Sequence, residues 1–425
     1  MPASRSLLSR FRLGVVSFLT ATSVCAGTIP PSVHTDYEEP FTMSASECLA
    51  PELLKGPHHR VLEQVQNDGF FNHYTVQSPF GEFTAPSTTM LKFLINELNA
   101  IAEMKKVETD DAAVASLKKS GQNTIKGIKS LFTDTEDTLK GAASGVQSIF
   151  HRASESIGSR DPTGAEDSRM KQVIGYSKSK GRIATSYQVN VYSRNQVLQK
   201  ELDRLAWADY LGGLGVGVAT SAIPGIGGVV LTTSGTARLL NETINTTPAS
   251  ELWVQSRDKL MALGMDADTV QLFLNHDMFS PALYTVMTSA LQSMREVDNL
   301  ELFLKVSLPA STPEMARMIT ETAVLTAGYH KHVEPLASIV PMVRITRAVN
   351  RDGDAVVILP TDHLIWTEKT AGVLTEISEK VSASGGRETE LWVLGDLSET
   401  MQRECTKKGW KVRTNVRAKL IPVER

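Results

Sequence analysis

A glycine-rich stretch without a single charge constrains the fold of this chain more than any other feature. Residues 210–237 form a run of 28 positions that contains eight glycines and Pro224 and lacks Asp, Glu, Lys and Arg. A charge-free run of this length would cross a bilayer, where small residues let helices approach closely. Pro224-Gly225 is a turn signal, and it divides the run into two pieces shorter than the roughly 20 residues that a span needs. We therefore expect a buried helical hairpin, with membrane insertion as the alternative.

The first 26 residues have the three-part order of a secretory signal peptide. Three arginines precede an apolar run over 13–24, and Val24 and Ala26 stand at the −3 and −1 positions of a cleavage site. The run is about half as long as a stop-transfer helix. We expect cleavage after Ala26 and an exported protein, periplasmic or secreted. A lipoprotein acylated on Cys25 is the alternative, although the residues before this cysteine lack the usual leucine and small residue.

Cleavage would remove one of the three cysteines and leave Cys48 and Cys405. In an oxidising compartment these two can pair, which would tie the N-terminal segment to the C-terminal domain. Two free thiols are the alternative, because pairing also requires a suitable distance between the two Cα atoms. Cys48 and Cys405 are therefore a candidate disulfide.

Composition and periodicity predict an α+β protein that is mostly α-helical. Asn67-Asp68-Gly69 is a hairpin turn signal, and Ser87 is the expected N-cap of the helix that follows. The expected parts are the signal peptide (1–26), an extended Pro-rich arm (27–60), a β-hairpin plus helix unit (61–109), a basic amphipathic connector (110–192), a helical domain that includes the Gly-rich segment 210–237 (193–342) and an α/β domain (343–425).

Three dipeptides predict helix starts in the helical domain, with proline in the first turn, where its missing N–H costs nothing. They are Thr247-Pro248, Ser280-Pro281 and Thr312-Pro313, and they lie 33 and 32 residues apart. This spacing fits a degenerate repeat of paired helices over 247–342. It fits an ordinary helical bundle equally well.

The last 80 residues change from a helical to a β-α-β-α-β order. Strands are expected at 355–359, 391–394 and 410–416, with helices at 362–382 and 397–408 between them. This order predicts a small parallel sheet with right-handed crossovers.

Polar side chains follow the first two of these strands. Asp362 and His363 come after the first strand, and Asp396 comes after the second. Open parallel sheets bind ligands beyond the carboxyl ends of their strands, and two carboxylates with an imidazole could hold a metal or act as acid and base. The alternative is helix capping, because both aspartates stand where the N-cap of a predicted helix belongs.

A second candidate metal site consists of His330 and Glu334. They are four residues apart in a helical stretch, so they could share one helix face. No third ligand accompanies them at a recognised spacing. A histidine at the end of a helix, just before Pro335, is the alternative.

The motifs that are missing narrow the functional classes. No zinc-protease, serine-hydrolase, Walker or EF-hand signature occurs, and Gly213, Gly215 and Gly217 follow a predicted helix where a phosphate-binding loop would follow a strand. No cofactor is predicted. A net charge of −3 argues against a nucleic-acid-binding protein.

The connector has the composition of a helix that lies on anionic lipid. Residues 117–182 contain 12 Lys or Arg and 7 Asp or Glu, with apolar residues at helical spacing between them. A solvated helix or a linker is the alternative. The function expected from these features is that of an exported non-enzymatic envelope protein, which associates with a membrane surface or a protein partner. A hydrolase or metal-dependent enzyme, and a secreted effector or pore-forming protein, are the alternatives.

Overall fold

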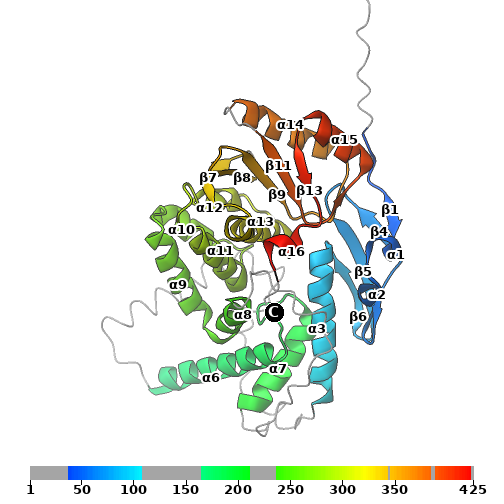
Figure 1. Cartoon of the computed structure of the whole chain (residues 1–425). Coiled ribbons are helices and arrows are strands. Elements are labelled where there is room, and N and C mark those ends of the chain that lie inside the picture. The colour runs from blue at the N-terminus through cyan, green and yellow to red at the C-terminus, as the bar shows by residue number, and fades with distance from the viewer. Residues whose placement is uncertain (1–36, 108–163, 211–235, 343–344, 384–387, 423–425) are drawn as a thin grey trace, which may run out of the picture. The chain divides into compact units, whose positions relative to one another are not determined.

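A computed structural model of the chain describes residues 37–107, 164–210, 236–342, 345–383 and 388–422 (Figure 1). The chain divides into two compact units, 1–36 and 37–425, and the described residues all belong to the second. The predicted signal peptide, residues 211–235 of the glycine-rich run and residues 110–163 of the connector lie outside them. The described part is a mixed α/β structure rich in helices, which confirms the predicted mixture of helices and strands.

An antiparallel sheet with one long helix forms the N-terminal part. Its strand order is β1-β4-β5-β3-β2, and β6 pairs with β5. Ser87 caps the helix through its side chain, as predicted, by accepting the N–H of Met90. The elements are β1 (Thr42–Ser44), α1 (Ala45–Cys48), α2 (Pro51–Leu54), β2 (Lys55–Gly56), β3 (His59–Val61), β4 (Gln64–Asn67), β5 (Asn72–Ser78), β6 (Gly81–Ala85) and α3 (Thr88–Lys106).

The prediction of an extended arm over 27–60 is wrong for its last part. Residues 42–60 form two short helices and three strands. Ala45, Leu49 and Leu53 recur every fourth residue and are buried in the same hydrophobic cluster as Tyr74. Pro51 opens α2, where the missing N–H of proline costs nothing. The apolar period therefore decides the structure here, and the proline content does not.

The next helices in the described ranges are α6 (Gly164–Ser186), α7 (Gln196–Tyr210) and α8 (Thr236–Thr246). α6 passes close to α8 at a glycine: a Cβ on Gly181 would lie 1.9 Å from the backbone oxygen of Asn245. This approach brings the end of α6 and the segment after it against α8.

All three predicted helix starts of the helical domain are present. Ser280 and Thr312 accept the N–H groups of Leu283 and Met315. Pro248 is itself the N-cap of its helix. The helices of this part are α9 (Ala249–Ala262), α10 (Ala267–Leu274), α11 (Pro281–Ser293), α12 (Leu302–Ser307) and α13 (Pro313–His332).

The C-terminal sheet is larger than predicted. β9, β11 and β13 are parallel, as expected, but β8 and β7 extend the sheet on the β9 side in antiparallel pairing. The elements are β7 (Leu336–Pro341), β8 (Thr346–Asn350), β9 (Ala355–Leu359), β10 (His363–Leu364), α14 (Glu368–Ala383), β11 (Thr389–Val393), β12 (Asp396–Leu397), α15 (Glu399–Lys407), β13 (Lys411–Arg413) and α16 (Arg417–Leu420).

This sheet separates two hydrophobic cores. Val356 and Ile358 belong to the large core of the helical domain, and Val357 and Leu359 belong to a smaller core with α14 and α15. Figure 1 shows α14 and α15 on one side of the sheet and α13 on the other. None of the helices in the described ranges is long and apolar enough to cross a membrane.

Candidate functional site

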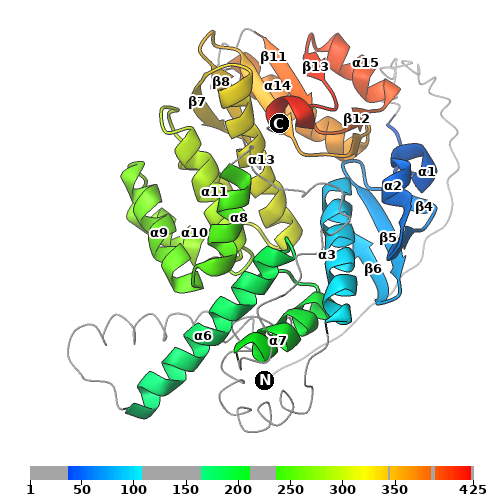
Figure 2. The same ribbon diagram turned by 60° about the horizontal axis from the view of Figure 1, so that its bottom comes forward.

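A large cavity lies between the N-terminal helix α3 and the helical domain. It has a volume of about 1710 Å³, and its walls come from α3, residues 185–197, α8, α11 and the first turns of α13. Figure 2 shows α3 on one side and α8, α11 and α13 on the other. The cavity continues around the edge strand β6 to the polar face of the N-terminal sheet. It exceeds the 300–1,000 Å³ that is usual for small-molecule sites.

The wall opposite α3 is mostly apolar. α11 contributes Leu283 and Val286, and α8 contributes Leu240 and Ile244 together with the polar Asn241 and Glu242. On the other side, α3 contributes the half-buried ring of Phe93. A cavity with such walls favours an apolar ligand or the apolar part of an amphiphile.

A short segment between α6 and α7, residues 187–195 and here called the cavity loop, is fixed on two sides. Asn96 of α3 donates its side-chain N–H to the backbone oxygen of Gln188 at 2.9 Å. Asn245 of α8 donates to the oxygen of Val189 at 2.9 Å and accepts the N–H of Val191 at 3.0 Å. The cavity loop is therefore held between α3 and α8.

Glu97 of α3 fixes the end of the same loop. Ser193 donates its hydroxyl to Glu97 at 2.5 Å, and Asn195 donates its side-chain amide at 3.0 Å. Asn195 also caps α7 by accepting the N–H groups of Val197 and Leu198. Burial raises the pKa of Glu97, while these two donors oppose the shift. Both oxygens of Glu97 thus have neutral partners.

Two arginines, Arg194 of the cavity loop and Arg317 of α13, line the cavity. The Arg317 guanidinium lies over the Phe93 ring, 5.4 Å from its centroid. Burial lowers the pKa of Arg317, and the nearby charge of Arg194 adds to this. Among the described residues neither guanidinium has a hydrogen bond or an ion pair. Each guanidinium has five N–H donors to offer to a ligand.

Glu321, which follows Arg317 by four residues on α13, is buried and forms an ion pair with a different arginine. Glu321 accepts Arg417 at 3.1 Å and the Thr89 hydroxyl at 3.3 Å. Burial raises its pKa, and the charge of Arg417 opposes this shift. Glu321 therefore forms its ion pair with Arg417, and its charge attracts Arg317 only over a longer distance.

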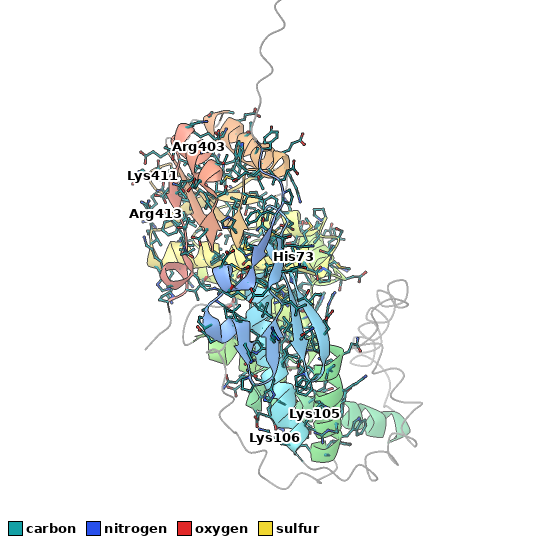
Figure 3. The ribbon with its side chains drawn as sticks, turned by 90° about the vertical axis from the view of Figure 1, so that its right-hand side faces the viewer. His73, Lys105, Lys106, Arg403, Lys411 and Arg413 are labelled. Carbon is teal, nitrogen blue, oxygen red and sulfur yellow. The ribbon has the colours of Figure 1, made fainter. Side chains whose placement is uncertain are left out.

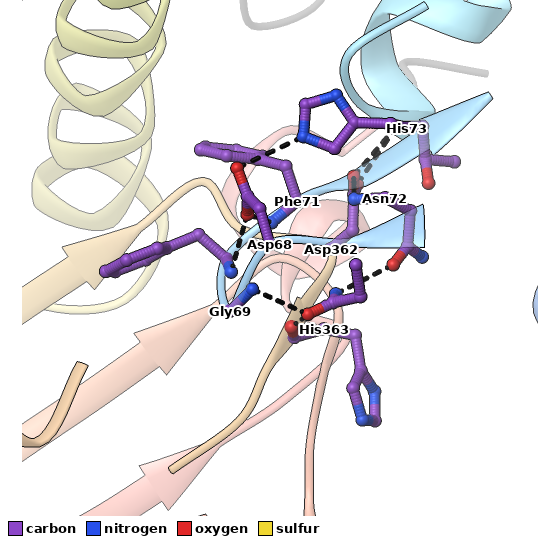
Figure 4. A network of polar contacts seen from close by, with 10 residues as sticks. Asp68, Gly69, Phe71, Asn72, His73, Asp362 and His363 are labelled. Carbon is purple, nitrogen blue, oxygen red and sulfur yellow. Dashed lines mark hydrogen bonds and ion pairs between the residues drawn. The ribbon is translucent and has the colours of Figure 1, made fainter. Parts of the chain in front are cut away.

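The structure places the predicted residue Asp362 in a tertiary contact. Its Oδ2 atom accepts the N–H of Asn72 at 3.1 Å and that of Thr88 at 3.0 Å. Figure 4 shows this carboxylate beside the hairpin turn that contains Asp68 and Gly69. Burial raises the pKa of Asp362 to about 6, while these N–H groups oppose the shift. Asp362 thus binds the first N–H of α3 and not that of α14.

The other two predicted residues of this group have partners of their own. His363 and Asp396 are aligned in the parallel pair of β10 and β12. The His363 ring packs edge-on against Phe41, with 6.0 Å between the centroids, and Asp396 accepts the Asn415 amide at 2.6 Å. Burial lowers the pKa of His363, although the charge of Asp396 opposes this. A catalytic role for the group stays a prediction.

The capping alternative is wrong about which helices the two aspartates would cap. α14 begins only at Glu368, where Thr367 accepts the N–H of Thr370. Ser398 caps α15 by accepting the N–H of Met401, and Asp396 lies in β12. Both predicted helix starts were early, 362 against Glu368 for α14 and 397 against Glu399 for α15, because a short strand stands between each aspartate and its helix.

His330 and Glu334 do not share a helix face. α13 ends at His332, so Glu334 lies beyond the helix. His330 accepts the N–H of Leu336 at 3.0 Å, and Glu334 accepts the Asn350 amide at 3.0 Å. Within the ranges that the structure describes, no group of three or more His, Cys, Asp or Glu could hold a metal ion.

Cys48 and Cys405, the predicted disulfide pair, are free thiols in the structure. Cys48 lies 4.0 Å from the Tyr74 hydroxyl, in contact with the N-terminal core. Cys405 is buried in the core under α14 and α15, 4.0 Å from the sulfur of Met401. The two cysteines therefore belong to different cores.

Figure 3 labels six basic side chains that come from several elements. Four of them are paired with an acid. The pairs are His73 with Asp68, Lys105 with Glu201, Lys106 with Glu103 and Lys411 with Glu388. These paired side chains offer little positive charge for an anionic surface.

The cavity was not predicted from the sequence. A signal exists in α3, because Thr89, Lys92, Phe93, Asn96 and Glu97 follow a three- and four-residue spacing. This spacing defines a second, mainly polar face of α3, beside the apolar face that packs in the N-terminal core. Such a face predicts a polar contact, but it does not name the partner.

Comparison of the chain with models of protein families, with characterised proteins and with solved structures finds no match.

Proposed function

We propose that this chain is an exported, non-enzymatic envelope protein that binds an apolar or amphiphilic small molecule in the cavity between α3 and α11. The observation that carries the proposal is the cavity itself, about 1710 Å³ in volume with an apolar wall of α8 and α11 residues. An envelope supplies ligands of this kind, because its lipids combine long apolar chains with polar headgroups.

The physical gain from filling such a cavity is large enough for specific binding. Transfer of about 300 Å² of apolar ligand surface from water yields about 7 kcal/mol, before the cost of association is subtracted. The cavity loop adds pre-organisation, because Asn96, Glu97 and Asn245 hold it in place without a ligand. A wall that is already ordered does not have to be ordered on binding.

The predicted association with a membrane surface or a partner remains part of the proposal. The segments from which it was predicted, 110–152 and 210–237, lie almost entirely outside the described residues. A protein that exchanges an amphiphile with a membrane must approach that membrane, so ligand binding and surface association are compatible. The enzyme and pore-forming alternatives stay predictions, and no contact in the cavity favours either.

A neutral fluorescent probe, N-phenyl-1-naphthylamine, tests the proposal on the full mature chain. We expect saturable binding with enhanced fluorescence, because the probe leaves water for an apolar wall. The variant Leu240→Trp adds bulk to a half-buried residue that lines the cavity. We expect it to weaken probe binding by about 10-fold or more, which corresponds to roughly 1.4 kcal/mol.

The matched control is Leu272→Trp on α10. Leu272 is 60% exposed and does not line the cavity, so the same substitution there should leave probe binding unchanged. Circular dichroism and thermal melting of both variants check that they fold. Equal probe binding by the two folded variants would refute the cavity as the site.

A further inference from the structure

We infer that the cavity selects ligands with an anionic headgroup, a carboxylate or a phosphate, which Arg194 and Arg317 bind together. This inference rests on the proposed function and adds the chemical class of the ligand. The observation behind it is that both arginines line the cavity without a hydrogen bond or an ion pair among the described residues.

Arg317 is half-buried at the cavity, and its N–H groups have no hydrogen-bond or ion-pair partner among the described residues. Its guanidinium lies over the face of the Phe93 ring. The ring attracts the positive charge, but it is not a strong hydrogen-bond acceptor for the five N–H groups. These unpaired N–H groups are open to a ligand in the cavity, and a carboxylate or a phosphate would engage two of them at once. A bound anion therefore supplies what the wall around Arg317 lacks.

Arg194 lies near enough to Arg317 to repel it. Arg194 and Arg317 line the same cavity, and burial and then the charge of Arg194 lower the pKa of Arg317. An anion that lies between the two guanidinium groups is attracted by both of them, and its charge offsets their mutual repulsion. The anchored cavity loop keeps Arg194 at this place.

The acids close to these arginines do not replace the ligand. Glu97 uses its two oxygens for Ser193 and Asn195. Glu314 also lines the cavity, but it is exposed and forms no ion pair with either arginine among the described residues. Glu321 is paired with Arg417. The N–H groups of both arginines therefore remain available.

The apolar wall defines where the rest of the ligand lies. Leu283 and Val286 of α11 and Leu240 of α8 line the same cavity as the two arginines. A ligand bound by its anionic group at Arg317 can therefore extend an alkyl chain along α11. The expected ligand is an anionic amphiphile and not a free anion.

Calorimetric titration of the full mature chain with three probes tests this inference. The probes are decyl phosphate, 1-decanol and inorganic phosphate, which share either the chain or the headgroup. We expect decyl phosphate to bind at least about 10-fold more tightly than 1-decanol, since hydrogen bonds to charged groups contribute this much. Inorganic phosphate should bind much more weakly than decyl phosphate.

The variant Arg317→Met should remove the preference for decyl phosphate over 1-decanol and leave 1-decanol binding intact. Binding of 1-decanol thus reports that the cavity of the variant is folded. Arg295→Met is the matched control, because Arg295 is exposed and does not line the cavity. It should retain the full preference.

The possible failures are distinguishable. Equal affinity of the unaltered chain for decyl phosphate and 1-decanol would overturn the anionic headgroup and keep the proposed function. Equal affinity for decyl phosphate and inorganic phosphate would overturn the amphiphile in favour of a free anion. Absence of binding by decyl phosphate and 1-decanol would overturn both the inference and the proposed function.

Discussion

The Asp362 carboxylate joins the C-terminal domain to β5 and α3, and burial of its charge costs free energy. It is largely buried beside the hairpin turn, and its pKa is raised from 3.8 to about 6. The folded protein therefore binds this proton more tightly than the unfolded chain. The contribution of Asp362 to the free energy of unfolding falls as the pH rises from about 4 to above 6, by at most about 3 kcal/mol.

The substitution Asp362→Asn should stabilise the protein at pH 8 by about 1–3 kcal/mol. The N–H groups of Asn72 and Thr88 both reach the Oδ2 atom, so a single amide oxygen there can accept both. The variant thus keeps these two hydrogen bonds, loses the second contact of Thr88 with Oδ1 and loses the buried charge. Urea unfolding at pH 8 and at pH 4 measures the effect, and the difference between the two proteins should shrink at pH 4.

Asp362→Ala is the companion variant, because it removes the acceptor as well as the charge. We expect it to destabilise the protein at pH 4, where the unaltered side chain is protonated but still bonded. A lower stability of Asp362→Asn than of the unaltered chain at pH 8 would show that the ionised hydrogen bonds outweigh the burial cost.

The sequence predicted the kind of chemistry at Asp362 but not its partner. A carboxylate that accepts backbone N–H groups at the start of a helix is what the capping hypothesis proposed. The helix concerned is α3, and Thr88 lies 274 residues before Asp362. Local sequence signals describe neighbours along the chain, so this partner could not be found from them. The same holds for Glu97 and the cavity loop.

At the scale of elements, the packing of α13 on α16 depends on a glycine. A Cβ on Gly328 would lie 2.2 Å from the backbone oxygen of Leu420. No side chain can move to relieve this contact, because the atom belongs to the backbone. α13 also carries Arg317 and Glu321, so its position decides the geometry of one cavity wall.

Gly328→Ala should lower the free energy of unfolding by about 1–3 kcal/mol, as overpacking usually does. Gly372 of α14 provides the matched control, since a Cβ there would meet nothing within 4 Å. Gly372→Ala should raise the free energy of unfolding by about 0.5–1 kcal/mol, because alanine favours the helix. Urea unfolding of both variants gives the comparison, and a gain in both would contradict the close packing of α13 on α16.

Elements with a local signal were predicted well. The turn at Asn67-Asp68-Gly69 is present between β4 and β5, and Ser87, Ser280 and Thr312 cap helices. The structure of residues 42–60 was not predicted, because the five prolines over 27–60 favour an extended arm and mask the four-residue apolar period. β7 was not expected either, because its residues fell within the predicted helical domain over 193–342, although β7 pairs with the next strand along the chain, β8.

At the scale of the molecule, the export prediction is tested by fractionation of cells that express the full chain. We expect the mature protein to begin at Gly27 and to leave the membrane fraction without an alkaline carbonate wash. Mass spectrometry of the purified protein measures the first residue. Retention through carbonate would indicate that the glycine-rich run inserts in the membrane, and retention lost only in high salt would indicate the lysine-rich connector.

The segment after β9 is synthesised long after the turn between β4 and β5 that it contacts. Asn72 donates to Asp362, which lies 290 residues further along, and Glu38 accepts the Trp366 N–H across 328 residues. At a synthesis rate of 5–20 residues per second, roughly 15–60 s separate the appearance of the first contact's two halves. During that time the N-terminal sheet lacks its contact with Asp362. Substitutions at Asp362 should therefore change the yield of folded protein during translation, in addition to its stability.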